Sequence, residues 1–216
     1  SYRGPRQLGK QYRVDTAGTT HGRIEDYAVI GNCETIALVG RDGSIDWMCL
    51  PRFDSGACFS ALLGSAGNGR WLIAPAMQPA RVSRSYEGQS LILNTIFHTD
   101  GGAVCVRDFL LRRDGVSDLV RLVQGLHGRV SMQTEITVRF DYGLVVPWVS
   151  RQPDGRLQFV AGADRILLDS GVDLRGEGMS TVGEFEVKAG QEIAFSLCWT
   201  PSYCTRPAPV QAVTAL

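Results

Sequence analysis

Five aspartates are the first candidates for chemistry, because they lie in the most patterned stretches of the chain: Asp42, Asp46, Asp54, Asp108 and Asp141. Two carboxyl groups about 6.5–9.5 Å apart could hydrolyse a glycosidic bond with inversion, one as general acid and one as the base that activates water. Each acid also has a structural explanation. Asp42 precedes Gly43 in a turn, where its carboxylate can bond to the backbone, and Asp54 can cap a short helix.

Asp46 and Asp108 lie among apolar neighbours, so we expect them to be partly buried and bonded to an arginine, such as Arg41, Arg52 or Arg107. A paired buried acid supports a fold without performing a reaction. The serine-nucleophile pattern GxSxG and the phosphate loop GxxxxGK[ST] are both absent from the sequence. We therefore assign no catalytic residue to these 216 residues.

Aromatic side chains are the second candidate feature, because sugar rings pack well on aromatic faces. The set comprises Trp47, Phe53, Trp71, Tyr86, Tyr142 and Trp148. Trp47 and Trp71 lie in apolar strands and are predicted to be core residues. Trp148 follows Pro147 in a loop-like stretch, so it is predicted to be exposed at an interface or at a sugar site.

The histidines and cysteines of the sequence do not indicate a metal site or a redox site. The histidines His21, His98 and His127 are widely spaced, so we expect neither a metal site nor a cofactor. The six cysteines form no CxxC pair and lie mostly in apolar runs. We expect them to be reduced core residues, with one or two disulfides as the alternative, and we expect a cytoplasmic protein.

The composition indicates a compact domain. Lysine plus arginine and aspartate plus glutamate number 22 each, so no net charge attracts nucleic acid or an anionic membrane. Residues 1–22 form a polar extension with no apolar segment of membrane-spanning length. Residues 23–200 are predicted to be one large domain, followed by a Pro-rich linker at 201–216.

The apolar patterns in that domain are nearly all those of strands. Residues 36–39 and 45–50 are apolar runs joined by a polar loop with an Asp-Gly pair, which predicts a hairpin. Further pairs are expected at 90–98 with 103–110 and at 183–187 with 192–197. Residues 55–63 are the one predicted short helix, closed by Gly64. The expected fold is all-β, a large antiparallel β-sandwich (a supersandwich) with one short helix.

Several ordered motifs extend across this domain. They are Ile24-Glu25-Asp26-Tyr27, Gly31-Asn32-Cys33, Arg41 to Trp47, Leu50 to Ser55, Gly69-Arg70-Trp71, Val106 to Phe109, and Arg139 to Gly143. Together they closely resemble the opening of the bacterial trehalase and glucoamylase-like proteins of glycoside hydrolase family 15. In that family an N-terminal β-sandwich precedes an all-helical (α/α)6 barrel that carries the catalytic carboxylates. The resemblance therefore implies a non-catalytic domain whose partner is the helical barrel of the same polypeptide, with a glucose-containing oligosaccharide as the substrate of the full enzyme.

Under this reading, Arg52, Phe53 and Asp54 form a surface ridge that docks on the barrel or reaches the rim of its sugar pocket. Trp47 and Trp148 are further candidates for that interface or rim. Two other readings stay open: an autonomous carbohydrate-binding module, which requires an exposed tryptophan, and a self-contained hydrolase. A sandwich without its barrel should expose an apolar face, which predicts self-association of the isolated chain.

Overall fold

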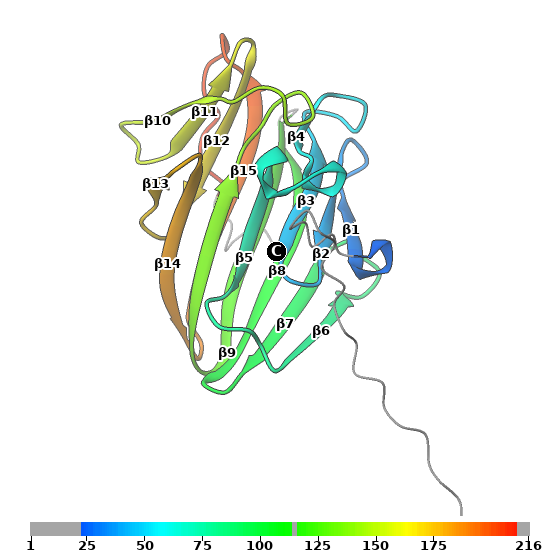
Figure 1. Ribbon diagram of the computed structural model, residues 1–216, viewed down its shortest axis with the longest axis vertical. Coiled ribbons are helices and arrows are strands. Elements are labelled where there is room, and N and C mark those ends of the chain that lie inside the picture. Colours follow the sequence, from blue (N-terminus) through cyan, green and yellow to red (C-terminus); the bar gives the residue numbers. More distant parts are fainter. Residues whose placement is uncertain (1–22, 114–115, 211–216) are drawn as a thin grey trace, which may run out of the picture.

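The computed structural model describes residues 23–113 and 116–210, and these form two antiparallel β-sheets packed face to face (Figure 1). The predicted N-terminal extension and the end of the predicted linker, residues 211–216, lie outside the described residues. The all-β prediction and the antiparallel sandwich are confirmed.

The first sheet contains β1 Tyr27–Gly31, β2 Ile36–Gly40, β3 Ser44–Cys49, β4 Ala57–Phe59, β5 Arg70–Pro75, β13 Arg175–Glu177 and β14 Ser180–Lys188. The second contains β6 Arg81–Tyr86, β7 Leu93–Thr99, β8 Gly102–Arg113, β10 Trp148–Arg151, β11 Leu157–Ala161, β12 Asp164–Ser170 and β15 Glu192–Pro201.

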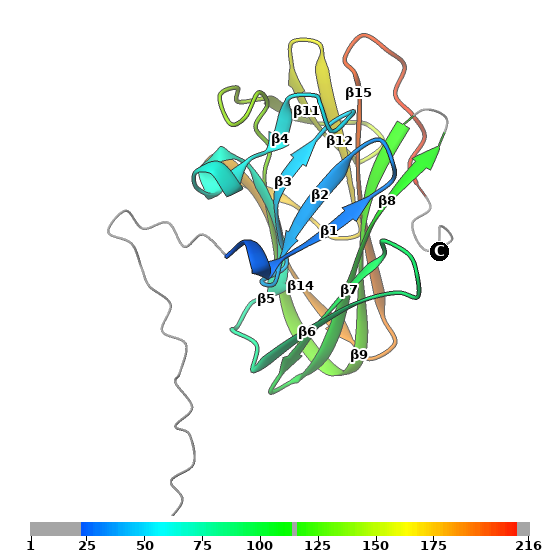
Figure 2. The same ribbon diagram turned by 90° about the vertical axis from the view of Figure 1, so that its right-hand side faces the viewer.

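One strand, β9 Val116–Thr137, belongs to both sheets (Figure 2). Its first half pairs with β8 and β15 in the second sheet, and its second half pairs with β5 and β14 in the first. The change of sheet occurs around Gly125 and Gly128, where a Cβ atom would lie within 2.2 Å of a neighbouring carbonyl oxygen. Glycine is therefore required where the strand passes from one layer to the other.

The space between the sheets is filled by apolar side chains from alternate strand positions, with Trp71, Phe97 and Phe195 among the largest. Trp71 is fully buried, as predicted, and its indole Nε1 donates to the Thr134 hydroxyl over 3.1 Å. Burial of such side chains stabilises the fold by about 25 cal/mol per Å² of apolar surface. Within residues 23–113 and 116–210, one ion pair is fully buried in this core.

Arg121 on β9 and Asp108 on β8 are register partners whose side chains both point into the core, each with 0% of its side chain exposed. The guanidinium donates to both Asp108 carboxylate oxygens, at 2.7 and 3.3 Å. It also crosses to the other sheet, where it donates to the Trp71 and Gly43 carbonyl oxygens, each at 2.7 Å. Asp108 is thus bonded to an arginine, as predicted, but to Arg121 and to none of the three arginines suggested from sequence. The pair joins the two layers.

The structure corrects three local predictions. The pair expected at 183–187 with 192–197 does not form, because β14 pairs with β13 and β9 whereas β15 pairs with β9 and β12. The short helix expected at 55–63 is reduced to a 3-10 turn at Ala61–Leu63 closed by Gly64, because Ala57–Phe59 pairs with β3 as a strand. Further 3-10 turns lie at Ile24–Asp26 and Ala66–Asn68. Trp47, predicted to be a core residue, is half-buried on the outer face. A β-bulge between β2 and β3 pairs Leu38 with Trp47 but Val39 with Ile45, which turns Trp47 outward.

After β15 the chain turns back along the outer face of the second sheet (Figure 2). Arginines on that face hold its backbone: Arg156 donates to the Pro207 carbonyl, and Arg165 donates to the Ser202 and Cys204 carbonyls. Val210 packs beside Phe109 and Val120. The start of the predicted linker is therefore attached to the domain.

All six cysteines are unpaired, and only Cys33 and Cys204 are exposed. Burial raises the pKa of the Cys105 thiol to about 11 and that of Cys198 to about 12, so neither forms the reactive thiolate near neutral pH. We expect a maleimide to label two of the six thiols in the folded protein and all six after denaturation, as counted by mass spectrometry. Rapid labelling of a third thiol in the folded protein would contradict the described packing.

Candidate functional site: an apolar rim at one end of the sandwich

Nine of the 17 large exposed apolar side chains in the described ranges lie on the loop after β9, at the start of β10, or on segments bonded to or near that loop, which crosses the upper end of the sandwich in Figure 1. We call this set the apolar rim: Phe53, Leu63, Tyr142, Leu144, Val145, Val146, Trp148, Val149 and Met179. Exposed apolar patches of this kind usually mark an interaction site. Trp148, with 79% of its surface exposed, begins the edge strand β10 of the second sheet. The exposure predicted for this tryptophan is confirmed.

The loop that follows β9 carries four of the nine rim residues, Tyr142, Leu144, Val145 and Val146. Its residues Asp141, Tyr142 and Gly143 all have positive φ angles, of 50°, 58° and 95°. Two consecutive non-glycine residues in this region are unusual, and such conformations persist only where the surroundings enforce them. Here Phe140 and Val145 exchange backbone hydrogen bonds of 2.9 and 3.0 Å across the turn. The loop is thus fixed in a conformation that presents apolar side chains to solvent.

This loop is fastened to the neighbouring segment 55–58. Arg139 N–H donates to the Cys58 carbonyl at 3.2 Å, and Tyr142 N–H donates to the Ala57 carbonyl at 3.3 Å. The Tyr142 ring also lies 6.0 Å from the Trp47 ring, centroid to centroid. Trp47 therefore supports the rim from the outer face of the first sheet.

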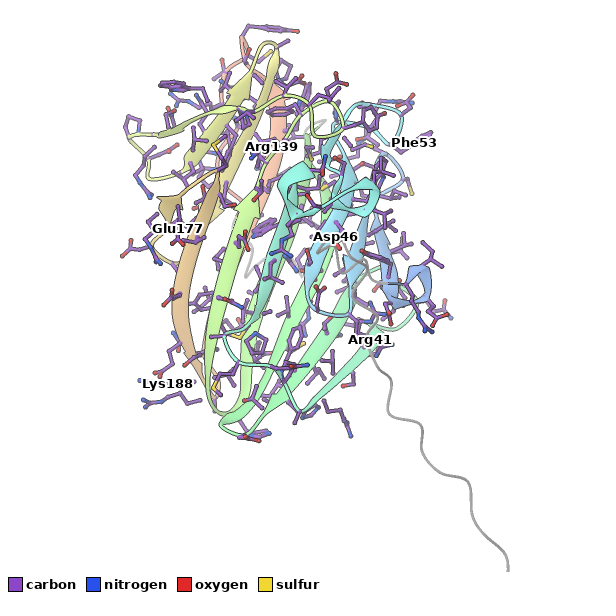
Figure 3. The ribbon with its side chains drawn as sticks, in the orientation of Figure 1. Arg41, Asp46, Phe53, Arg139, Glu177 and Lys188 are labelled. Carbon is purple, nitrogen blue, oxygen red and sulfur yellow. The ribbon has the colours of Figure 1, made fainter. Side chains whose placement is uncertain are left out.

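The predicted ridge of Arg52, Phe53 and Asp54 forms a tight turn at the same end. Arg52 Nε lies 2.9 Å from the Asp54 carboxylate, and this pair holds the pKa of Asp54 below its usual value. Phe53 is 62% exposed and projects away from the sandwich (Figure 3). Its backbone N–H donates to the Glu34 carbonyl at 2.9 Å, which attaches the turn to the segment that precedes β2. Docking by this ridge stays a prediction.

Asp54 does not cap a helix, because its carboxylate is engaged by Arg52. Asp42 does bond to its own turn, since its carboxylate accepts from the Ser44 backbone N–H at 3.0 Å. Asp46 accepts from the Tyr27 hydroxyl at 2.6 Å and from the Ser44 hydroxyl. The predicted bond between Asp46 and an arginine is therefore wrong for the described residues. Burial and the bond to Asp46 raise the pKa of the Tyr27 phenol. These carboxylates are all engaged in local structure.

Two hollows on the second sheet have volumes of about 70 and 150 Å³. Pockets that enclose a small-molecule ligand usually measure about 300–1,000 Å³, so neither would bury a disaccharide. The smaller hollow is lined by Leu50, Pro51 and Trp199 among others, and the larger one by Phe195 and Val210 among others, so neither is lined by a rim residue. In the described part of the chain, no three metal-ligating side chains converge.

Sequence reasoning missed the centre of the rim. Leu144, Val145 and Val146 form an apolar run between Gly143 and Pro147, a pattern that usually indicates a buried strand. In the structure the bridge between Phe140 and Val145 closes the turn too early for a strand, and the run stays exposed. The positive φ angles at Asp141 and Tyr142 leave no recognisable signal in the sequence.

Comparison with known proteins identifies the family. The family model described as trehalase-like, N-terminal, matches residues 11–197. The chain belongs to the trehalase-like N-terminal domain family. The trehalase of Mycolicibacterium smegmatis is 27% identical over 86% of this chain and 31% of its own length. Trehalase 1 of Sulfolobus acidocaldarius is 35% identical over 63% of this chain and 23% of its own length, and trehalase 2 is 33% identical over 60% and 21%.

This trehalase-like domain spans about a third or less of the length of these curated relatives. A solved polysaccharide lyase superposes with a TM-score of 0.46 at 8% identity, over 83% of this chain and 33% of that one, which is too distant to inform function. Within residues 23–113 and 116–210, no helix has the length and apolar character needed to cross a membrane.

Proposed function

We propose that this domain is the non-catalytic N-terminal part of an inverting α-glucoside hydrolase, either a trehalase or a glucoamylase-like enzyme. Its role is to pack against and stabilise the helical catalytic barrel, and its rim helps to shape the edge of the sugar pocket. The apolar rim carries the proposal, because nine exposed apolar side chains, four of them on one ordered loop, are typical of a surface that contacts a partner. The relatives support it, since each named trehalase is at least about three times as long as the matched region.

The test is glucose release from trehalose, maltose and isomaltose. We expect no turnover by the 216-residue chain and clear turnover when it is joined to the polypeptide encoded downstream of Leu216. The preferred sugar would distinguish a trehalase from a glucoamylase-like enzyme. Turnover by this chain alone would overturn the proposal and direct attention to Asp46 and Asp141.

A carbohydrate-binding module is the second candidate, and the exposed Trp148 favours it. An exposed indole could stack on a sugar ring. This alternative predicts saturable binding of malto-oligosaccharides to the isolated chain in titration calorimetry, with loss of binding in Trp148→Ala. If the isolated chain binds no malto-oligosaccharide at millimolar concentration, the carbohydrate-binding module is excluded and the docking role is the remaining proposal.

A further inference from the structure

A buried arginine without a carboxylate partner lies at the start of the rim loop. Four arginines in the described ranges are at least nine-tenths buried: Arg121, Arg139, Arg156 and Arg165. Arg121 and Arg156 are paired with Asp108 and Asp154. Arg165 donates to two carbonyl groups of the segment that follows β15. Arg139, like Arg165, donates to backbone carbonyl groups and to no carboxylate among the described residues, and it differs from Arg165 in its place at the start of the rim loop.

Arg139 is 7% exposed, and its side-chain hydrogen bonds within the described part of the chain all go to backbone carbonyls. Its two terminal nitrogens donate to the Val138 carbonyl at 2.7 Å and to the Met179 carbonyl at 3.4 Å. Burial lowers the pKa of this guanidinium, and no nearby acid counteracts that effect. A guanidinium has five N–H donors, so several remain free to bind an anion. A buried cation without a counter-charge is costly.

The position of Arg139 connects this cation to the apolar rim. Met179, whose carbonyl it contacts, is a rim residue, and Phe140 to Val149 follow Arg139 directly in the chain. Figure 3 shows Arg139 just below the loop that crosses the end of the sandwich. The rim thus combines exposed apolar side chains with one desolvated positive charge. Interfaces commonly combine such an apolar surround with a central arginine.

We propose that the rim receives a carboxylate from its partner, and that this carboxylate pairs with Arg139. The partner surface is therefore an aspartate or glutamate surrounded by apolar side chains, on the polypeptide that follows this domain in the longer relatives. This inference rests on the proposed docking function and specifies its chemistry. Charge complementarity selects the occupant: the rim's apolar side chains match an apolar surround, and the guanidinium requires an anion.

The test compares thermal unfolding of this chain alone with thermal unfolding of the longer polypeptide that includes the downstream segment. We expect Arg139→Met to leave the melting temperature of the isolated chain unchanged or raised, because an unpaired buried charge is removed. In the longer polypeptide the same change should lower the melting temperature of this domain by about 5 °C or more, because the partner's carboxylate loses its counter-charge. Arg139→Lys should recover part of that loss, since it keeps the charge.

Leu144→Ser is the matched control, because it removes an exposed apolar side chain and leaves the charge in place. If Leu144→Ser destabilises the longer polypeptide and Arg139→Met does not, the result would support docking through the apolar rim. It would overturn the proposed pairing of Arg139 with a carboxylate of the partner. If neither variant has an effect there, the docking function fails as well. Equal destabilisation of both proteins by Arg139→Met would assign Arg139 a purely internal role. A dimer of the isolated chain that Arg139→Met dissociates would make a second copy the occupant and also overturn the inference.

Discussion

Replacing Asp108 with alanine is expected to lower the free energy of unfolding by about 3–5 kcal/mol, because it leaves the Arg121 guanidinium buried without a counter-charge. Arg121 would keep its bonds to the Trp71 and Gly43 carbonyls, but these are neutral acceptors. Urea unfolding followed by tryptophan fluorescence would measure the change as a lower midpoint with an unchanged slope.

Two further variants serve as controls: one removes a carboxylate from an exposed ion pair, and the other removes both charges of the buried pair. Glu177→Ala removes the carboxylate of an exposed pair with Arg175, and we expect a loss of less than about 1 kcal/mol. Asp108→Leu combined with Arg121→Met removes both charges of the buried pair, and we expect it to recover much of the stability lost by Asp108→Ala. A cost below about 1 kcal/mol for Asp108→Ala would mean that the pair does not join the layers as described.

Replacing Gly43 with alanine is expected to destabilise the protein by more than about 2 kcal/mol. Gly43 has a φ angle of +87°, and a Cβ atom there would lie 2.3 Å from the Ile73 carbonyl oxygen. The backbone would have to move away from β5, and the Gly43 carbonyl would then shift relative to the Arg121 guanidinium. Calorimetric melting of the variant would measure the loss.

Gly155 offers a matched control, because its φ angle is +88° and no atom lies within 4 Å of the place where its Cβ would be. Gly155→Ala therefore carries the backbone penalty alone, about 1–2 kcal/mol. The difference between the two variants isolates the steric clash at Gly43. Equal losses of stability in Gly43→Ala and Gly155→Ala would show that the turn at Gly43 adjusts its backbone without displacing β5.

The hairpin at 36–50 could be predicted from sequence because its signal is local: two apolar runs and an Asp-Gly turn whose carboxylate bonds within the turn. Asp46 and Trp47 could not be placed in the same way. The bulge between β2 and β3 shifts the register, so Asp46 reaches Tyr27 and Trp47 faces outward. A shift of one residue reverses the face on which every later side chain lies.

The other failures have a common cause in long-range pairing. Arg121 finds Asp108 through the register of β8 and β9, which the sequence of either strand does not reveal. Residues 55–63 have the cap, apolar positions and closing glycine of a short helix, but Ala57–Phe59 gains hydrogen bonds as a partner of β3. The rim was predicted at Phe53 and Trp148, where turn residues mark the surface, and missed at Leu144 to Val146, where apolar residues suggested burial.

The shared strand β9 also bears on how the protein is made. Its first half lies between β8 and β15, and its second half lies between β5 and β14. Both β14 and β15 follow β9 by more than 40 residues, at Ser180–Lys188 and Glu192–Pro201. During synthesis on the ribosome, each half of β9 therefore has one edge without hydrogen-bond partners until β14 and β15 emerge. Unpaired edges can pair with strands of other chains, so the nascent chain depends on β14 and β15 for protection from aggregation.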